Sequence, residues 1–189
     1  MYKKCKTSES LKRQREFEAC LLDMMKSIPY KKISVTDLCA QIGIARKNFY
    51  RYFENKDDVL VALIDHTITE YPKYKFPFPN TSNDLFKEID QYLYFWKTNH
   101  LLLDALTNNR LETILMERVL IHAWRFDKTL LKTEGTIKDP NNVTFVISGL
   151  ISLVFVWHRE NYKTPKCQLA CTIQRLLSEP IFTLSDYST

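Results

Sequence analysis

The sequence predicts an all-α fold of about nine helices, divided between a small N-terminal and a larger C-terminal domain. Only three of the 189 residues are glycine, whereas 13% are aromatic. A strand-rich protein of this length needs more glycine for its turns, and the Gly-rich fingerprints of nucleotide-binding folds are missing from the sequence. Apolar residues recur at spacings of three and four along most of the chain, which indicates helices with one buried face.

The first helix is indicated by a stripe of apolar side chains at helical spacing. The stripe consists of Phe17, Cys20, Leu21, Met24 and Ile28. Pro29 has no backbone N–H to continue the helix, so we expect the helix to end there.

Two short helices are expected next. Ser34, with Asp37 three residues later, is the pattern of a helix N-cap with a carboxylate in the first turn. Gly43 closes this second helix because glycine adopts the left-handed conformation at little cost. The third helix is expected from about Arg46 to Phe53.

A fourth helix, capped by Asn55, is expected from Lys56 towards Tyr71 and leads to the domain boundary. Three prolines follow, and they cannot continue a helix: Pro72, Pro77 and Pro79. The predicted division is therefore an N-terminal domain of residues 1–55, a connecting helix of residues 56–71 and a C-terminal domain of residues 72–189.

About five helices are expected beyond this boundary. Two of them carry apolar stripes, namely Leu85, Ile89, Tyr92, Leu93 and Trp96, then Leu111, Leu115, Val119, His122 and Phe126. A short helix over Leu101–Leu106 lies between them, and the second striped helix is expected to end near Lys132. Asp139–Pro140 and Thr164–Pro165 start the last two helices, because proline suits the first helical position. The final helix is expected to end around Ser178.

The most apolar run, Phe145–Trp157, predicts a buried helix. It has 13 residues, whereas a membrane span needs roughly 20. The charged N-terminus has no signal-peptide pattern. The odd number of five cysteines, with no extracellular context, indicates reduced thiols. We therefore expect a cytoplasmic protein with no membrane association.

Positive charge is concentrated at the start of the chain. Residues 1–60 hold 13 Lys and Arg against 8 Asp and Glu, whereas residues 61–189 hold 14 of each. This asymmetry is typical of a module that meets a polyanion, although a solvated basic surface would show it too.

The stretch KISVTDLCAQIGIARKNFYRYFENKDDVL, residues 32–60, has the pattern of a helix-turn-helix. Its second helix offers polar side chains to a partner, while Ile44, Phe49 and Phe53 face inward. Arg and Asn side chains pair with guanine and adenine edges in the major groove. Tyr and Lys side chains suit phosphate oxygens, and Lys56 stands in a first helical turn, where free N–H groups favour a phosphate.

This segment resembles the DNA-binding domain of the TetR/AcrR family of transcriptional regulators. In that family it reads approximately G-[IV]-S-x-x-[TN]-[FL]-Y-x-[HY]-F-x-x-K-x-x-L, which residues 43–60 follow closely. Ala45 replaces the usual Ser, so a capping hydroxyl is missing, and Lys47 stands where many members have a small residue.

The resemblance implies a role for each matching position. Thr36 would touch the DNA backbone or a base edge. The candidates for reading bases are Arg46, Lys47 and Asn48, and those for contacting phosphates are Tyr50, Tyr52 and Lys56. Lys3, Lys4 and Lys6 could add contacts as an arm, but we expect them to form a solvated tail.

The resemblance also implies a homodimer joined through the last two helices in a four-helix bundle. The Phe145–Trp157 run is apolar on every side, which a partner would explain, although burial within one subunit would too. Such a dimer would read a two-fold symmetric double-stranded DNA operator. The expected function is a sequence-specific DNA-binding regulator, in this family most often a repressor that an effector releases.

An unknown small-molecule effector would bind in the C-terminal domain. Its candidate contacts are Trp96, His100, His122 and Trp124, for which core packing is the alternative explanation. A protein partner could replace the small molecule, since LLDMMKSIPYKKISVTDLC resembles a subgroup that includes regulators of dihydroxyacetone kinase operons.

No catalytic constellation or cofactor motif is present, so an enzyme is not expected. Cys167 and Cys171 share a helix face, but they lack a cluster of four metal ligands, and we interpret them as small interface residues. A redox role for these two thiols stays open.

Overall fold

The computed structural model describes residues 2, 3, 5, 7–71, 82–130 and 140–178, with the backbone alone for residues 82, 124–130, 140 and 143. Over these residues the chain forms nine α-helices, one turn of 3-10 helix and no strand. The predicted all-α fold is therefore confirmed. The helices gather into two compact units.

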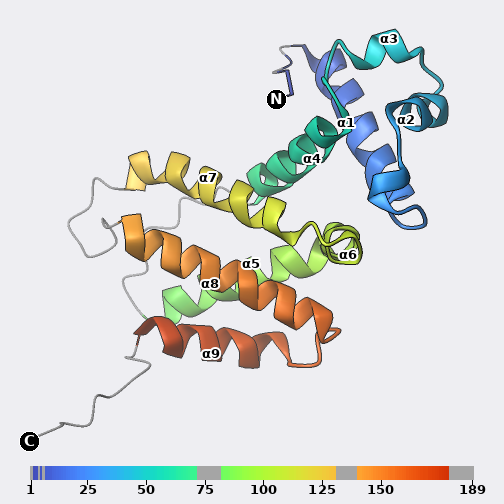
Figure 1. Cartoon of the computed structure of the whole chain (residues 1–189). Helices are drawn as coiled ribbons and strands as arrows, with labels where there is room; N and C mark the ends of the chain where they lie inside the picture. The colour runs from blue at the N-terminus through green and yellow to red at the C-terminus, as the bar shows by residue number, and fades with distance from the viewer. Residues whose placement is uncertain (1, 4, 6, 72–81, 131–139, 179–189) are drawn as a thin grey trace, which may run out of the picture. The chain divides into compact units, whose positions relative to one another are not determined.

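The first unit combines the N-terminal helices with two later ones (Figure 1). Its elements are α1 (Ser8–Met24), η1 (Tyr30–Lys32), α2 (Val35–Ile42), α3 (Arg46–Phe49), α4 (Lys56–Glu70), α6 (His100–Asn109) and α7 (Glu112–Leu130). Helix α1 packs on α2 and α4, and α4 packs on α7. The predicted domain boundary after Tyr71 falls on residues 72–81, which lie outside the described residues, so it stays a prediction.

Helix α1 ends earlier than the sequence indicated. Its last residue is Met24, and the chain then turns, with the N–H groups of Lys26 and Ser27 donating to the carbonyl oxygens of Asp23 and Met24. Ile28 therefore lies beyond the helix and is 36% exposed, whereas Phe17 and Leu21 are fully buried. The expectation that Ile28 continues the buried stripe is wrong, because a turn rather than Pro29 stops the helix.

Helix α2 begins and ends with the predicted signals. Ser34 Oγ accepts the Asp37 N–H at 3.2 Å, and the Asp37 carboxylate accepts the Ser34 N–H at 2.8 Å. The Ser34 hydroxyl also donates to the Asp37 carboxylate at 2.7 Å, and this bond, together with the one from the Ser34 N–H, lowers the pKa of Asp37. Gly43 follows α2 with φ 74°, the left-handed conformation that favours glycine.

Helix α3 is shorter than predicted, since it ends at Phe49 and residues 50–52 form turns. Its N-cap, Ala45, makes no side-chain capping bond, as the missing hydroxyl implied. Phe49 and Phe53 pack edge-on against Phe17 of α1, with ring centroids 5.2 Å and 5.7 Å away, and all three side chains are fully buried. Packing, rather than helix length, therefore holds α3 in place.

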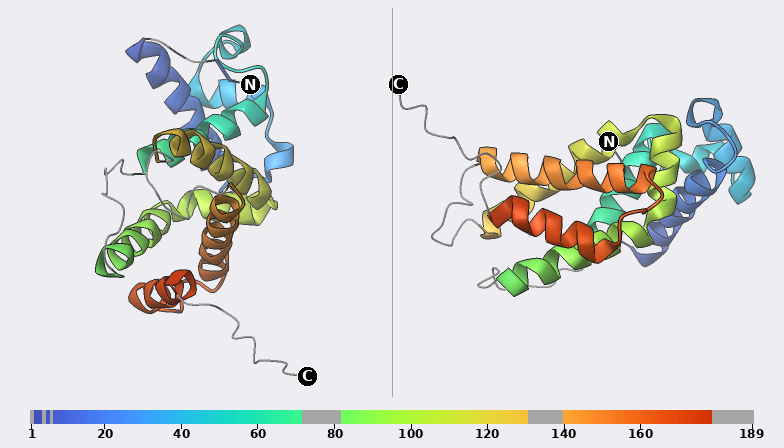
Figure 2. Two further views of the ribbon diagram at one scale, coloured as in Figure 1. Left: turned by 90° about the vertical axis from the view of Figure 1, so that its left-hand side faces the viewer. Right: turned by 90° about the horizontal axis from the view of Figure 1, so that it is seen from below.

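The second unit consists of α5 (Ser82–Thr98), α8 (Pro140–Arg159) and α9 (Lys166–Ser178). Helix α5 packs against α8 and lies alongside α9 (Figure 2). Buried apolar side chains from all three helices form its core: Ile89, Leu93, Trp96, Ile151, Val154, Trp157, Leu169 and Ile173. Pro140 begins α8 as predicted, while Lys132 and Asp139 lie outside the described residues.

Candidate nucleic-acid interface

Helices α2 and α3 and the turn between them form a helix-turn-helix. The turn is closed by two backbone bonds, from Gly43 N–H to Ala40 O at 3.2 Å and from Ile44 N–H to Cys39 O at 3.0 Å. Leu38 of α2 and Phe49 of α3 are fully buried. The predicted motif is thus present with its apolar side turned inward.

The polar residues predicted to meet DNA stand on the opposite side of this motif. Thr36, Arg46 and Lys47 are exposed, Tyr50 is 41% exposed, and Asn48 and Tyr52 are half-buried. They come from α2, α3 and the turn after α3, so one surface carries donors of several kinds. A surface of this composition can meet both phosphates and base edges.

Arg46 is oriented by Tyr50, four residues later. Its Nε donates to the Tyr50 hydroxyl at 3.1 Å, and its guanidinium carbon lies 5.6 Å from the centroid of the Tyr50 ring. This bond uses one of five N–H donors and does not involve the two terminal nitrogens. Those nitrogens carry the paired donors that match a guanine edge.

Lys56 contacts the backbone that leads into α2. Its Nζ donates to the carbonyl oxygens of Tyr30 at 2.7 Å and Ile33 at 2.8 Å, and lies 4.3 Å from the centroid of the Tyr30 ring. Two of the three ammonium donors are therefore used inside the domain, which leaves one for a phosphate. This positioning role was not predicted from the sequence.

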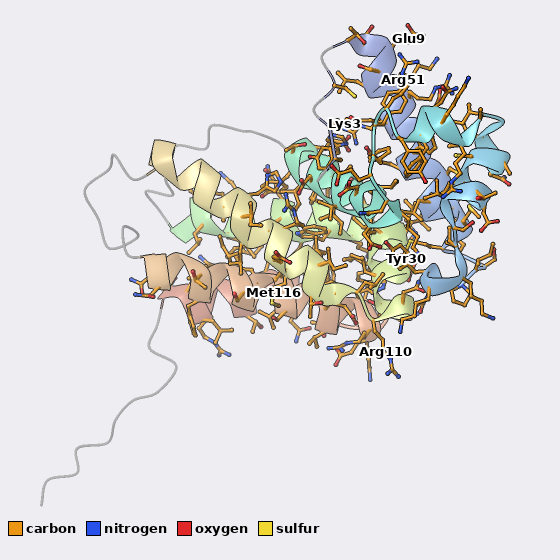
Figure 3. All side chains as sticks on the ribbon, turned by 45° about the horizontal axis from the view of Figure 1, so that its top comes forward. Lys3, Glu9, Tyr30, Arg51, Arg110 and Met116 are labelled. Carbon is orange, nitrogen blue, oxygen red and sulfur yellow. The ribbon has the colours of Figure 1, made fainter. Side chains whose placement is uncertain are left out.

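Lys3 contacts the backbone that follows α3 (Figure 3). Its N–H donates to Tyr52 O at 3.0 Å, and its Nζ donates to Tyr50 O at 2.8 Å. The side-chain amide of Gln14, itself only 1% exposed, donates to Lys3 O at 2.7 Å. The expectation of a solvated tail is therefore wrong for Lys3. Carbonyl groups after the end of a helix have no partner within it, and Lys3 supplies donors to two of them. Lys4 and Lys6 lie outside the described residues.

A buried carboxylate, Asp65 of α4, is bonded to three other side chains, and we call these four residues the Asp65 cluster. It accepts Arg118 Nε at 2.7 Å and Nη2 at 2.6 Å, both from α7, and the Tyr2 hydroxyl at 3.0 Å. His122 Nε2 lies 2.9 Å from the same carboxylate. Asp65 is 3% exposed, and burial alone would raise its pKa. The bonds from His122 and Arg118, with the charge of Arg118, instead lower that pKa to about 2.

Sequence comparisons identify the helix-turn-helix region. Residues 22–63 match the model of the bacterial regulatory proteins, tetR family. The chain is also 27% identical over 142 residues to an uncharacterized transcriptional regulatory protein of Saccharomyces cerevisiae. That match covers 72% of this chain but 17% of the yeast protein, so the chain spans less than a fifth of this relative.

Solved structures share the fold over most of both chains. Lin0861 of Listeria innocua has a TM-score of 0.69 at 18% identity, with 92% of this chain and 94% of that chain covered. The regulator FadR of Bacillus subtilis, solved with stearoyl-CoA, has a TM-score of 0.58 at 17% identity, covering 89% and 99%. The dihydroxyacetone kinase operon activator DhaS has a TM-score of 0.56 at 17% identity, covering 87% and 93%.

The helix-turn-helix region of the chain, residues 22–63, is therefore a region of the tetR-family type. Helices α2 and α3 both lie within the residues that the family model matches. No helix in the described part of the chain is long and apolar enough to cross a membrane.

The four predicted effector contacts lie in different surroundings. Trp96, in the second unit, is 3% exposed, and its indole N–H has no hydrogen-bond partner among the described residues. His100 is exposed, whereas His122 is buried and belongs to the Asp65 cluster of the first unit. The side chain of Trp124 lies outside the described residues. Among the three whose side chains are described, Trp96 is the one with a buried polar atom that still needs a partner.

Helices α8 and α9 present apolar side chains to solvent. The exposed fractions are 72% for Phe145, 41% for Val156, 37% for Leu176 and 39% for Leu177. A shallow hollow on α8 is lined by Phe145 and by small or polar residues, namely Asn141, Thr144, Ser148, Gly149 and Ser152. Cys167 and Cys171 are exposed on α9 as free thiols. Among the residues whose positions are described, no group of three potential metal ligands lies together.

Proposed function

We propose that this chain is a homodimeric transcriptional repressor that binds a two-fold symmetric operator and leaves it when a small molecule binds in the second unit. It would act where the chromosome lies, in the cytoplasm of a bacterial cell. The observation that carries the proposal is the two-sided character of α3: Phe49 is fully buried, while Arg46 and Lys47 beside it are exposed.

The proposed DNA contacts follow from the donors on this surface. Arg46, Lys47 and Asn48 read base edges, with the Arg46 guanidinium held in position by Tyr50. Phosphate contacts come from Tyr50, Tyr52, the third donor of Lys56, and Thr36 at the start of α2. Such contacts fix the register in which the base-reading side chains enter the major groove.

The proposed homodimer forms through α8 and α9. A solvent-exposed Phe145 and three further exposed apolar residues on these helices favour a partner, since removing apolar surface from water is favourable. Small residues in the α8 hollow allow a second helix to approach closely. A two-fold dimer presents two copies of α3, which matches an operator of two half-sites.

The proposed effector site lies beside Trp96. A buried donor without a partner costs about 1–3 kcal/mol, and an acceptor on a bound molecule would recover that energy. The FadR neighbour was solved in complex with stearoyl-CoA, a ligand with a long apolar chain and a polar end, which supports a ligand of that kind here. A ligand of that kind would release DNA by binding more tightly to one of two states of the protein.

The test measures binding of the full chain to the DNA immediately upstream of its own gene, by fluorescence anisotropy from about 50 to 200 mM salt. Six to ten phosphate contacts would weaken binding by roughly 10³–10⁵ across that range. Arg46→Ala should lose affinity and relax base preference, whereas Lys87→Ala, which removes an exposed cation from α5, should not. If neither this DNA nor any duplex selected from a random pool is preferred, the proposed function is wrong.

A second candidate function replaces the small molecule with a protein partner. It is favoured by the exposed apolar residues of α8 and α9 and by the fold shared with the dihydroxyacetone kinase operon activator. Size-exclusion chromatography with light scattering separates the two. A stable homodimer that covers these helices supports the repressor proposal, and a monomer that dimerises only with an added partner supports the second candidate.

A further inference from the structure

Tyr2 and Lys3, which we call the Tyr2–Lys3 arm, connect the end of α3 to the interior of the first unit. We propose that both are positioning residues for operator binding: they tie the backbone after α3 to the Asp65 cluster, which α4 and α7 share. This inference rests on the proposed DNA-binding function and names residues outside the segment that the family model matches.

The backbone after α3 needs such a tie because the helix itself is very short. Its helical residues are Arg46–Phe49, and Ala45 provides no side-chain cap. A helix of one turn has little stability of its own, and its last carbonyl groups have no partner within the helix. Lys3 supplies two donors at this point, its N–H to Tyr52 O and its Nζ to Tyr50 O.

The two carbonyl groups belong to residues whose side chains are proposed to hold phosphates. Fixing the backbone of Tyr50 and Tyr52 therefore fixes the points from which their hydroxyls reach the DNA. Tyr50 also orients Arg46 through the bond from Arg46 Nε, so the position of a proposed base-reading side chain depends on the same backbone. Lys3 is a cation at the C-terminal end of α3, where the helix dipole favours positive charge.

The arm is itself held from two sides. The buried Gln14 amide of α1 donates to Lys3 O, and the Tyr2 hydroxyl donates to Asp65 at 3.0 Å. The Tyr2 ring packs edge-on against His66 of α4, with centroids 5.7 Å apart. Burial and the neighbouring Asp65 raise the pKa of Tyr2 to about 12, so its hydroxyl remains a donor at neutral pH.

Asp65 links the arm to α7, because the same carboxylate accepts both guanidinium bonds of Arg118 and lies 2.9 Å from His122. Charged groups of α1 lie close to α4 as well: Glu18 lies 2.7 Å from His66, and Arg15 lies 3.3 Å from Glu18. A chain of contacts through Asp65, Tyr2 and Lys3 thus joins α7 to the end of α3.

Tyr2→Phe tests the inference, since it removes one hydroxyl and no charge. The probes are a duplex that the wild-type chain selects from a random pool and a scrambled duplex of equal composition. Loss of a hydrogen bond to a carboxylate should weaken binding to the selected duplex by about tenfold. The affinity for the scrambled duplex should change by less than about twofold. Tyr94→Phe, at a 60% exposed tyrosine of the second unit, is the matched control and should leave both unchanged.

Amide hydrogen exchange supplies a readout independent of DNA. In Tyr2→Phe the amides of residues 51–53, which bond to Asn48 O and Phe49 O, should exchange about tenfold faster. The amides within α4 should exchange as in the wild type. Lys3→Arg keeps a cationic donor and should retain more specificity than Lys3→Met.

The outcomes separate this inference from the function on which it rests. If the wild-type chain selects no duplex, the proposed function fails, and exchange at residues 51–53 alone decides whether the arm holds α3. If Tyr2→Phe binds both probes as the wild type does, the inference is overturned while the function stands. Equal weakening on both probes also overturns it, since a positioning residue acts on specific binding.

Discussion

Replacing Asp65 with Asn tests the energetic role of the Asp65 cluster. The substitution keeps the shape of the side chain but replaces one acceptor oxygen by a donor, which then faces the donors of Tyr2 and Arg118. The Arg118 side chain is only 13% exposed, so its charge would lose its partner in a mostly buried site. Removing one partner of a buried ion pair costs about 3–5 kcal/mol, and we expect a loss near the lower end at pH 7.

The Asp65 carboxylate should make the free energy of unfolding depend on pH in the acidic range. Its pKa is lowered from 3.8 to about 2 in the folded chain, so its contribution is complete above about pH 4 and is lost as the pH falls through 2. A shift of this size corresponds to about 2 kcal/mol, of which roughly half remains at pH 3. The stability gap between wild type and Asp65→Asn should therefore narrow by about 1 kcal/mol between pH 7 and pH 3.

Urea unfolding followed by circular dichroism at pH 7, 5 and 3 provides the measurement. Asp90→Asn is the matched control, because Asp90 pairs with Lys166 at 2.6 Å with both side chains 31% exposed. That partly exposed pair should contribute less than about 1 kcal/mol. A gap below about 1 kcal/mol at pH 7, or a gap that is the same at all three pH values, would refute the role assigned to Asp65.

Substitutions at three further positions have definite expected outcomes. Phe49→Ala should lower the free energy of unfolding by about 3–5 kcal/mol because it empties a fully buried ring site, and an unchanged urea midpoint would contradict this. Gly43→Ala should lower the free energy of unfolding by about 1–2 kcal/mol because of the φ of 74° alone, since an added Cβ meets nothing within 4 Å. Gly43→Asn should recover part of that loss in the same urea assay. Lys56→Met should lower both the unfolding midpoint and DNA affinity, because Lys56 holds two backbone carbonyls. If Lys56 only contacted a phosphate, Lys56→Met would lower DNA affinity and leave the unfolding midpoint unchanged.

Local signals in the sequence were sufficient to predict the helix-turn-helix. The capping pattern at Ser34, the left-handed glycine at position 43 and the cap at Asn55 each act within a few residues of chain, and the structure contains all three. Where the local signals failed, a competing local structure formed instead. A turn ended α1 before Pro29, and the residues after Phe49 turned rather than continuing α3.

The Asp65 cluster could not be read from the sequence because its partners are far apart in the chain. Tyr2 and Asp65 are separated by 63 residues, and Asp65 and Arg118 by 53. A weak signal exists, since Arg118 and His122 are spaced one helical turn apart on an otherwise apolar face. A polar residue in a buried stripe indicates that a partner is required, but the partner follows only from how the helices pack.

The basic surplus of the first 60 residues is a poor measure of the charge available to DNA. Lys3 uses one of its ammonium donors, and Lys56 uses two, on carbonyl groups at either end of the helix-turn-helix. Arg13 pairs with Glu16, Arg15 with Glu18 and Lys26 with Asp23. Together with Lys3 and Lys56, at least five of the 13 cations therefore contact a carboxylate or a carbonyl group among the described residues. The exposed cations of α3 itself are Arg46 and Lys47. DNA affinity should therefore fall strongly in Lys47→Ala and little in Arg13→Ala, although both substitutions remove one positive charge from the same domain.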